Sequence, residues 1–506
     1  MRHFGFTTFY SVLLRFADYS FISSLRSSEA NMNLMTKKQV DTLVIHAHLF
    51  TMQGTGVGYI ADGAIAVEGS RIVAVDSTEA LLSHFEGRKV IEAANCAVLP
   101  GLINAHVDTS LVLMRGAAQD VTNWLMDATM PYFAHMTPVA SMAATRLRVV
   151  EELKAGTTTF CDNKVFGPLW GEFFDEIGVR ASLAPMFDAL PLELPPLQEG
   201  DLYPFDIKAG RRAMEEAVDF ACAWNGAAEG RITTMLGMYS PDMVPLEMLR
   251  SAKEIAQREG LMLHFHVAQG DRETEQIVKR YGKRPIAFLA EIGYLDEQLL
   301  AVHLTDATDE EVIQVAKSGA GMVLCSGMIG IIDGLVPPAH VFRQAGGPVA
   351  LGSSYNNIFN EMKLTALFNK IKYHDPTIMP AWEVLRMATI EGARAIGLDH
   401  KIGSLEVGKE ADLILVDLSA PNLSPTLLNP IRNLVPNLVY AASGHEVKSI
   451  MVAGKLLMED YQVLTVDESA IVADAQVQAQ RLSQRVAADP IHKKIVLMEA
   501  MARGQL

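Results

Sequence analysis

Histidine and aspartate side chains stand at the ends of three short apolar segments of this chain. His106 and Asp108 close "GLINAHVD", and side chains two residues apart on a strand point to the same face. His264 and His266 share a face in "LMLHFHVA" in the same way, and His303 ends "LLAVHL". Neutral imidazole and carboxylate are ligands for Zn²⁺, Fe²⁺ or Mn²⁺. The residue types therefore predict a site for a divalent metal, if the fold brings these segments together.

Each of these residues also has a structural interpretation. A histidine at the end of a buried strand usually forms a structural hydrogen bond, and the two histidines of an HxH pair can occupy different layers of a barrel. Three separate segments that each deliver an imidazole to one rim favour the metal site.

The elements that would position these residues alternate between strand and helix over residues 101–402. Seven short apolar runs are typical of buried strands: 101–106, 156–163, 179–187, 261–268, 299–304, 319–325 and 348–354. Helical spacing occupies 137–156, 245–260, 284–293, 308–319 and 381–397, and several of these segments end in glycine. Repeated strand–helix units of this length predict a (β/α)8 TIM-like barrel, whose active site lies at the C-terminal strand ends. A doubly wound sheet is the alternative, and the first strand lacks its glycine-rich loop.

The flanking segments have β character. Residues 37–100, with a hairpin turn at Glu68–Ser70, and residues 403–465 predict one small β-sandwich built from both ends of the chain. Residues 466–506 have the spacing of a C-terminal helical tail. Residues 1–36 are expected to be a mobile extension, and Met32 or Met35 could be alternative starts.

Composition excludes several classes of protein. The 506 residues carry a formal charge of −16, which argues against a nucleic-acid partner. Four scattered cysteines do not form a disulfide framework, and no apolar run is long enough to cross a membrane. We expect a cytoplasmic protein with a small-molecule substrate.

The order of several motifs resembles the amidohydrolase superfamily, and most closely its methylthioadenosine/S-adenosylhomocysteine deaminase and triazine hydrolase branch. The resemblance covers about residues 38–490, and the motifs that carry it include "LPGLINAH", "ELKAGTTTF", "HFHVAQ", "AVHLTDATDEEV", "MATIEGARAIGL" and "GSLEVGKEADLILVDL". It implies the barrel, a composite β-sandwich and usually one divalent metal that activates water against a C–N or C–Cl carbon.

The resemblance carries metal ligation onto His106, His266 and His303, with Asp108 where the family's first strand has a second histidine. It also implies a divergent site, because Gln269 stands where the family has a proton-shuttling acid and Ser354 where it has a catalytic aspartate. Catalytic roles then fall to Asp108, His303 and Gln269, although an amide cannot exchange a catalytic proton. We expect Trp124, Tyr239 and Ser354 to contact the substrate, although Trp124, in a segment that covers the pocket mouth in the family, could equally serve loop packing.

Three functional hypotheses follow. The first is a divergent hydrolase that uses one divalent metal, Zn or Fe, on a C–N bond of a small nitrogen-containing or heterocyclic substrate. The second is a lyase or isomerase on the same fold. The third is a catalytically silent binding subunit. The resemblance also makes a homo-oligomer possible.

Overall fold

Eight parallel strands form the centre of the molecule in a computed structural model, which describes residues 37–121, 124–165, 167, 169–191, 200–489 and 496–506. Each strand pairs with the next along the chain, in an almost closed barrel. The strands are β6 (Leu102–Val107), β7 (Thr157–Lys164), β8 (Arg180–Phe187), β9 (Ile232–Met238), β10 (Met262–Val267), β11 (Leu299–His303), β12 (Gly321–Leu324) and β13 (Val349–Leu351). The TIM-like barrel predicted from the sequence is therefore confirmed.

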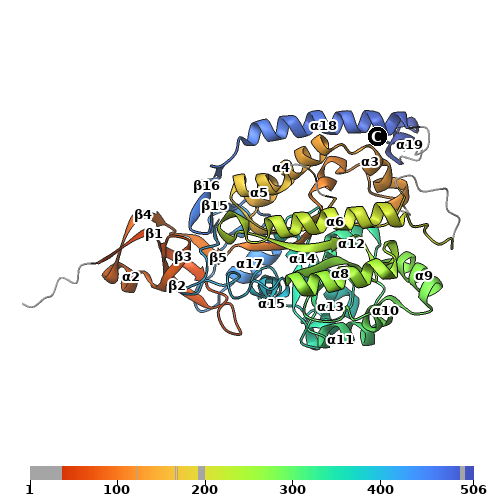
Figure 1. Cartoon of the computed structure of the whole chain (residues 1–506). Helices are drawn as coiled ribbons and strands as arrows, with labels where there is room; N and C mark the ends of the chain where they lie inside the picture. The colour runs from red at the N-terminus through yellow and green to blue at the C-terminus, as the bar shows by residue number, and fades with distance from the viewer. Residues whose placement is uncertain (1–36, 122–123, 166, 168, 192–199, 490–495) are drawn as a thin grey trace, which may run out of the picture.

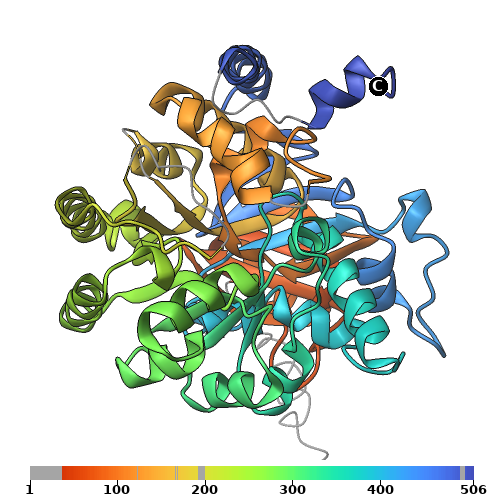
Figure 2. The same cartoon turned by 90° about the vertical axis from the view of Figure 1, so that its right-hand side faces the viewer.

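Helices surround the strands on the outside of the barrel (Figures 1 and 2). They are α4 (Pro138–Lys154), α5 (Trp170–Ile177), α6 (Ile207–Trp224), α7 (Ala227–Gly230), α8 (Leu246–Glu259), α9 (Gly270–Tyr281), α10 (Pro285–Glu291), α11 (Asp309–Lys317), α12 (Ser326–Ile332), α13 (Ala339–Gln344), α14 (Ile358–Tyr373), α15 (Ala381–Met387) and α16 (Ile390–Ala395). Apolar side chains from the strands fill the barrel interior, among them Ile103, Cys161, Ala184, Met235, Val302, Val323 and Ala350. The interior is therefore a packed core and not a pore.

The first and last strands of the barrel approach each other at a network of buried hydrogen bonds in the barrel wall.

 
Asn104 on β6 donates its amide hydrogens to both Glu152 carboxylate oxygens (2.8 and 2.9 Å) and to the Ser353 carbonyl oxygen (2.8 Å). Arg148 pairs with Glu152 at 2.5 Å and donates to the Ser353 carbonyl. At Gly352, just after β13, a Cβ atom would lie 2.9 Å from the His106 backbone nitrogen. The absence of a side chain there lets the end of β13 reach β6.

Strands from the two ends of the chain join in one continuous nine-stranded mixed sheet beside the barrel (Figure 1). They are β1 (Lys38–Phe50), β2 (Tyr59–Glu68), β3 (Arg71–Ser77), β4 (Phe85–Glu92), β5 (Cys96–Pro100), β14 (Leu413–Asp417), β15 (Val447–Val452), β16 (Lys455–Glu459) and β17 (Gln462–Val463). The hairpin of β2 and β3 turns at Gly69, where φ is +60°. The accessory unit predicted from both ends of the chain is thus present.

A buried ion pair joins this sheet to the barrel. Arg180 at the start of β8 makes two hydrogen bonds, of 2.7 and 3.0 Å, to the Asp412 carboxylate just before β14. Both side chains are only 3% exposed, so the charges are shielded from water. The pair fixes the base of the barrel against the sheet, at the opposite end of β8 from the candidate site.

The remaining helices lie outside these two units. They are α2 (Thr78–His84), α3 (Met130–His135), α17 (Leu434–Tyr440), α18 (Glu468–Ala488) and α19 (Val496–Ala502). The predicted mobile extension, 1–36, lies outside the described residues. In the part of the chain that is described, no helix has both the length and the apolar character needed to span a bilayer.

Candidate active site

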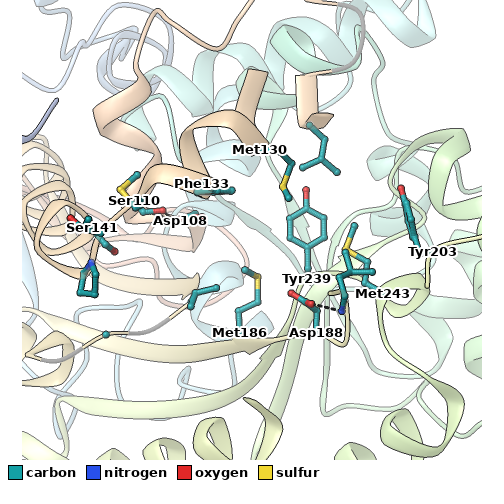
Figure 3. A pocket seen from close by; sticks show the side chains of 17 residues that line it. Asp108, Ser110, Met130, Phe133, Ser141, Met186, Asp188, Tyr203, Tyr239 and Met243 are labelled. Carbon is teal, nitrogen blue, oxygen red and sulfur yellow. Dashed lines mark hydrogen bonds between the residues drawn. The ribbon is translucent and has the colours of Figure 1, made fainter. Parts of the chain in front are cut away.

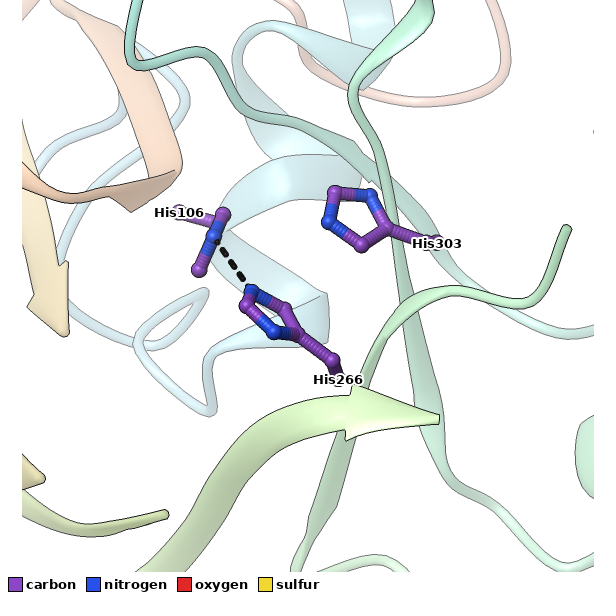
Figure 4. Close-up of side chains that lie close together, drawn as sticks. All are labelled: His106, His266 and His303. Atoms are coloured by element: carbon purple, nitrogen blue, oxygen red, sulfur yellow. Dashed lines mark hydrogen bonds between the residues drawn. The ribbon is translucent and has the colours of Figure 1, made fainter. Parts of the chain in front are cut away.

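Three histidines from different strands meet at one end of the barrel (Figure 4). His106 lies on β6, His266 on β10 and His303 at the last position of β11. One ring nitrogen from each lies within 4.8 Å of those from the other two, and all three side chains are buried. The strands therefore bring together the three imidazoles that the sequence predicts as metal ligands.

The histidine nitrogens suit a divalent metal. His106 Nε2 and His266 Nε2 are 3.2 Å apart. Two nitrogens bound tetrahedrally to zinc at about 2.0–2.1 Å would be separated by roughly 3.3 Å. Burial lowers the pKa of His106 to about 3 and also lowers the pKa values of His266 and His303. The imidazoles are therefore neutral at physiological pH and keep lone pairs for an ion.

His303 has further features that fit ligation. Both of its ring nitrogens are buried and have no hydrogen-bond partner among the described residues. Its backbone φ is +77°, a left-handed value that costs energy for a residue with a side chain, and Leu304 follows at +54°. The chain turns sharply here and points the imidazole toward His266, with the two rings stacked at 4.8 Å between centroids. A bound ion would give one of these two nitrogens a partner.

His264 lies one layer below the three histidines. It shares a face of β10 with His266, and its Nε2 lies 2.9 Å from His106 Nδ1. When His106 offers Nε2 to an ion, its Nδ1–H is the donor of this bond and His264 Nε2 the acceptor. The two members of the HxH pair therefore occupy different layers, and His264 supports a ligand rather than serving as one.

We expect His264→Phe to weaken metal affinity about 10–100-fold, because the ring of His106 loses the acceptor that orients it. Competition with a chelator, followed by metal analysis, measures this. His264→Gln, which can still offer an acceptor, should recover part of the affinity. An unchanged affinity in His264→Phe would mean that the hydrogen bond does not orient His106.

Asp108 follows β6 at the mouth of the barrel. Its Oδ1 accepts hydrogen bonds from the Ser110 backbone nitrogen and hydroxyl (2.8 and 2.5 Å), and its own backbone N–H donates to Ser354 Oγ (2.9 Å). Burial raises the pKa of its carboxyl to about 6, against the opposing effect of the Ser110 hydrogen bond. The three-histidine cluster does not include the Asp108 carboxylate. Its role as a fourth ligand stays a prediction.

The turn after Asp108 is held from below by Asp162 of β7. The Thr109 backbone nitrogen and hydroxyl donate to its two carboxylate oxygens (3.1 and 2.8 Å), and the Trp170 indole adds a third bond of 2.9 Å. All three side chains are buried. This network fixes the direction in which the chain leaves β6 and so positions Asp108.

A cavity of about 380 Å³ opens beside Asp108 (Figure 3). Its wall is mostly apolar, with Asp108 on one side and Asp188 on another. The lining residues include Leu125, Met130, Phe133, Met136, Met186, Tyr203, Tyr239 and Met243. A smaller cavity next to it is lined by both His106 and His266, and also by Asp108 and Ser354. Asp108 and Tyr239 line both spaces and so lie between the histidines and the larger cavity.

The other residues that the sequence predicts for the site differ in whether they line the two cavities. Tyr239 packs edge-on against His266 (4.7 Å between ring centroids), and in the part of the chain that the structure describes its buried hydroxyl has no hydrogen-bond partner. Trp124, on the helical turn η2 (Trp124–Thr129), lines the smaller cavity, and its side chain hydrogen-bonds to Asp333. Gln269 is not among the residues that line either cavity, although both polar atoms of its side chain are buried without a partner.

The sequence did not single out several residues of the cavity walls. Asn163 lines the smaller cavity and donates to the His264 carbonyl oxygen (2.7 Å). Met186 and Asp188, at the end of β8, and Tyr203 line the larger one. Position at a strand end was the available signal for Asn163 and Asp188, since strand ends of a barrel form its active-site face.

Comparison with known proteins places the chain in a family. The model of the amidohydrolase family matches residues 97–457. A 5-methylthioadenosine/S-adenosylhomocysteine deaminase from Pelotomaculum thermopropionicum is 33% identical over 452 residues, which cover 88% of this chain and 99% of the relative. A 5'-deoxyadenosine deaminase from Methanosarcina mazei is 32% identical over 462 residues, with the same coverage of both chains.

Solved structures agree with this placement. A zinc-bound adenosine deaminase from Xanthomonas campestris superimposes with a TM-score of 0.80 at 28% identity, over 88% of this chain and 100% of that one. The atrazine chlorohydrolase TrzN from Arthrobacter aurescens TC1, also with zinc, shares the fold, with a TM-score of 0.74 at 20% identity over 87% of this chain and 100% of that one. Sequence, fold and the three-histidine cluster lead to one conclusion: the chain belongs to the amidohydrolase family.

Proposed function

We propose that this protein is a metal-dependent hydrolase that removes an amino group from a small nitrogen heterocycle. The observation that carries the proposal is the meeting of three neutral imidazoles beside a cavity that also exposes a carboxylate, Asp108. Relatives named as deaminases of adenosine derivatives support the reaction class, a hydrolysis of a C–N bond.

His106, His266 and His303 would hold one divalent ion, and zinc in the related deaminase favours zinc over iron. Such an ion lowers the pKa of water and polarises the group that water attacks. Asp108 is the titratable carboxyl that lines both cavities. We therefore assign it the role of the general base, which accepts the proton of the attacking water. Tyr239, with an unpartnered hydroxyl, and Ser354 would contact the heterocycle.

Gln269 does not supply a proton in this scheme. Its side chain lines neither cavity, and both polar atoms of its amide are buried without a hydrogen-bond partner among the described residues, so we assign it no contact with the substrate. The acid that delivers a proton to the leaving amine would then be the protonated Asp108, acting after it has served as the base. One carboxyl would serve both steps, and this is the sense in which the proposed site is divergent.

The test combines metal analysis with an assay for released ammonia. Purified protein should contain about one equivalent of zinc or iron. It should release ammonia from at least one member of a panel of aminopurine nucleosides, aminopyrimidines and aminotriazines, and the product should carry one oxygen from ¹⁸O-labelled water. Turnover without solvent oxygen would contradict hydrolysis and favour a lyase or isomerase. Metal-free protein that turns over no member of the panel would contradict the proposal and favour a binding subunit.

A further inference from the structure

Asp188 is a carboxylate in the wall of the larger cavity to which the hydrolytic scheme gives no role. It follows β8 directly, on a different strand from any of the three histidines. Its Oδ1 accepts a hydrogen bond from the Leu190 backbone nitrogen (2.8 Å), the one side-chain bond found for it among the described residues. Burial raises the pKa of its carboxyl, and no cation counteracts this effect. A carboxylate in a cavity without a cationic partner is an open site for a positive group.

The backbone around Asp188 is held in place. The next residue, Ala189, donates its N–H to the Met243 carbonyl oxygen (3.0 Å) and accepts from the Asp206 backbone nitrogen (2.8 Å). Gly210 of α6 lies so near that a Cβ there would be 3.2 Å from the Asp188 carbonyl oxygen. The carboxylate therefore stands on a fixed turn, as a residue that determines specificity should.

The other residues of the cavity wall suit a ligand that carries a positive charge and is otherwise apolar. Among the described residues that line the cavity there is no lysine, arginine or histidine, and the two carboxylates are Asp108 and Asp188. Met186 and Met243 flank Asp188 in Figure 3. The nearby guanidinium of Arg272, whose charge opposes the rise in the pKa of Tyr239, forms an ion pair with Asp242 at 2.5 Å. An anionic ligand would therefore meet no cationic side chain among the described residues that line the cavity.

We propose that Asp188 binds a positively charged nitrogen of the substrate, and that this protein selects organic cations with an apolar body over neutral and anionic analogues. The inference rests on the proposed function and names the substrate class of that site: an amino heterocycle that carries a basic nitrogen or an alkylammonium substituent. The methionine-rich wall receives the apolar body, since methionine adapts to irregular shapes. The formal charge of −16 on the chain also attracts cations in solution.

The test compares two ligands of nearly equal size by calorimetry: 2-phenylethylammonium and 2-phenylethanol. The protein is used as purified, with any metal it holds. The ammonium ion should bind about tenfold more tightly than the alcohol, since a charge-assisted hydrogen bond is roughly twice as strong as a neutral one. Asp188→Asn should remove this preference and leave the affinity for the alcohol unchanged. Its amide oxygen can still accept from Leu190, so the turn should persist.

Glu215→Gln is the matched control. It removes one negative charge from the exposed face of α6, where no hydrogen bond or ion pair is found for Glu215 among the described residues, and it should keep the preference. Equal affinities for the two ligands in the wild type, or a preference that survives in Asp188→Asn, would overturn the inference. If Asp188→Asn does not fold, the wild-type comparison alone decides.

Failure of this inference is separate from failure of the proposed function, because binding is measured without turnover. A protein that binds the ammonium ion through Asp188 but releases no ammonia from any substrate keeps the inference and loses the function. A protein that deaminates neutral heterocycles and shows no preference for the cation keeps the function and loses the inference.

Discussion

Replacing His266 with alanine is expected to remove the metal and to lower kcat/KM at least about 10³-fold, because the water that attacks the substrate would return to its ordinary pKa. His266 is the central member of the cluster: its ring lies 3.2 Å from His106 Nε2 and stacks on His303. Two imidazoles would remain, which is fewer than the three protein ligands of catalytic zinc sites. Metal analysis of the dialysed variant and a steady-state assay measure the two effects.

His400→Ala is the control, since His400 is exposed and belongs to no metal-ligand cluster among the described residues. It should keep both metal and activity. If His266→Ala kept a full equivalent of metal, the cluster would not be the metal site, and the proposed function would lose the observation on which it depends. Loss of metal with unchanged turnover would instead point to chemistry that does not use the ion.

Most of the barrel could be predicted from local patterns. Seven strands were recognisable as short apolar runs, and each is present. The strand that was not singled out is β9, "ITTMLGM", where two threonines, two methionines and a glycine dilute the apolar pattern. The helix expected over 381–397 is two helices, α15 and α16, which meet at Thr389 (φ −131°, ψ −102°). Threonine in a helical pattern does not reveal such a break, since tertiary packing decides it.

The histidine cluster could be predicted because its members stand at strand ends, where parallel topology forces them to one rim. The position of His264 one layer below His266 could not be predicted. Alternation along a strand shows which face a side chain occupies, but not how deep in the barrel it lies. The residues of the cavity wall could not be predicted either. Met130 and Tyr203 come from segments between strands, and local sequence does not say over which strand end such a segment folds. Asp188 follows the end of a strand, as Asp108 does. A single aspartate in that position is common, so the position alone did not identify it as a site residue.

Asp108→Asn is the change that decides between a hydrolase and a silent subunit. The side chain keeps its size, and its Oδ1 can still accept from the Ser110 backbone nitrogen, so the turn after β6 should persist. The three histidines are untouched, so we expect metal content to remain near one equivalent. The amide cannot take a proton from water, and kcat should fall about 10²–10⁴-fold with little change in KM.

Asp219→Asn on the exposed face of α6 makes the same change of charge far from the strand ends and should have no effect on kcat. The alternatives give different patterns. Loss of metal together with activity in Asp108→Asn would make Asp108 a ligand rather than the base. Unchanged metal content and unchanged turnover would show that Asp108 is neither a ligand nor the base. Asp108 would then only line a binding cavity. Because metal and rate are measured on one sample, the two roles assigned to Asp108 cannot be confused with each other.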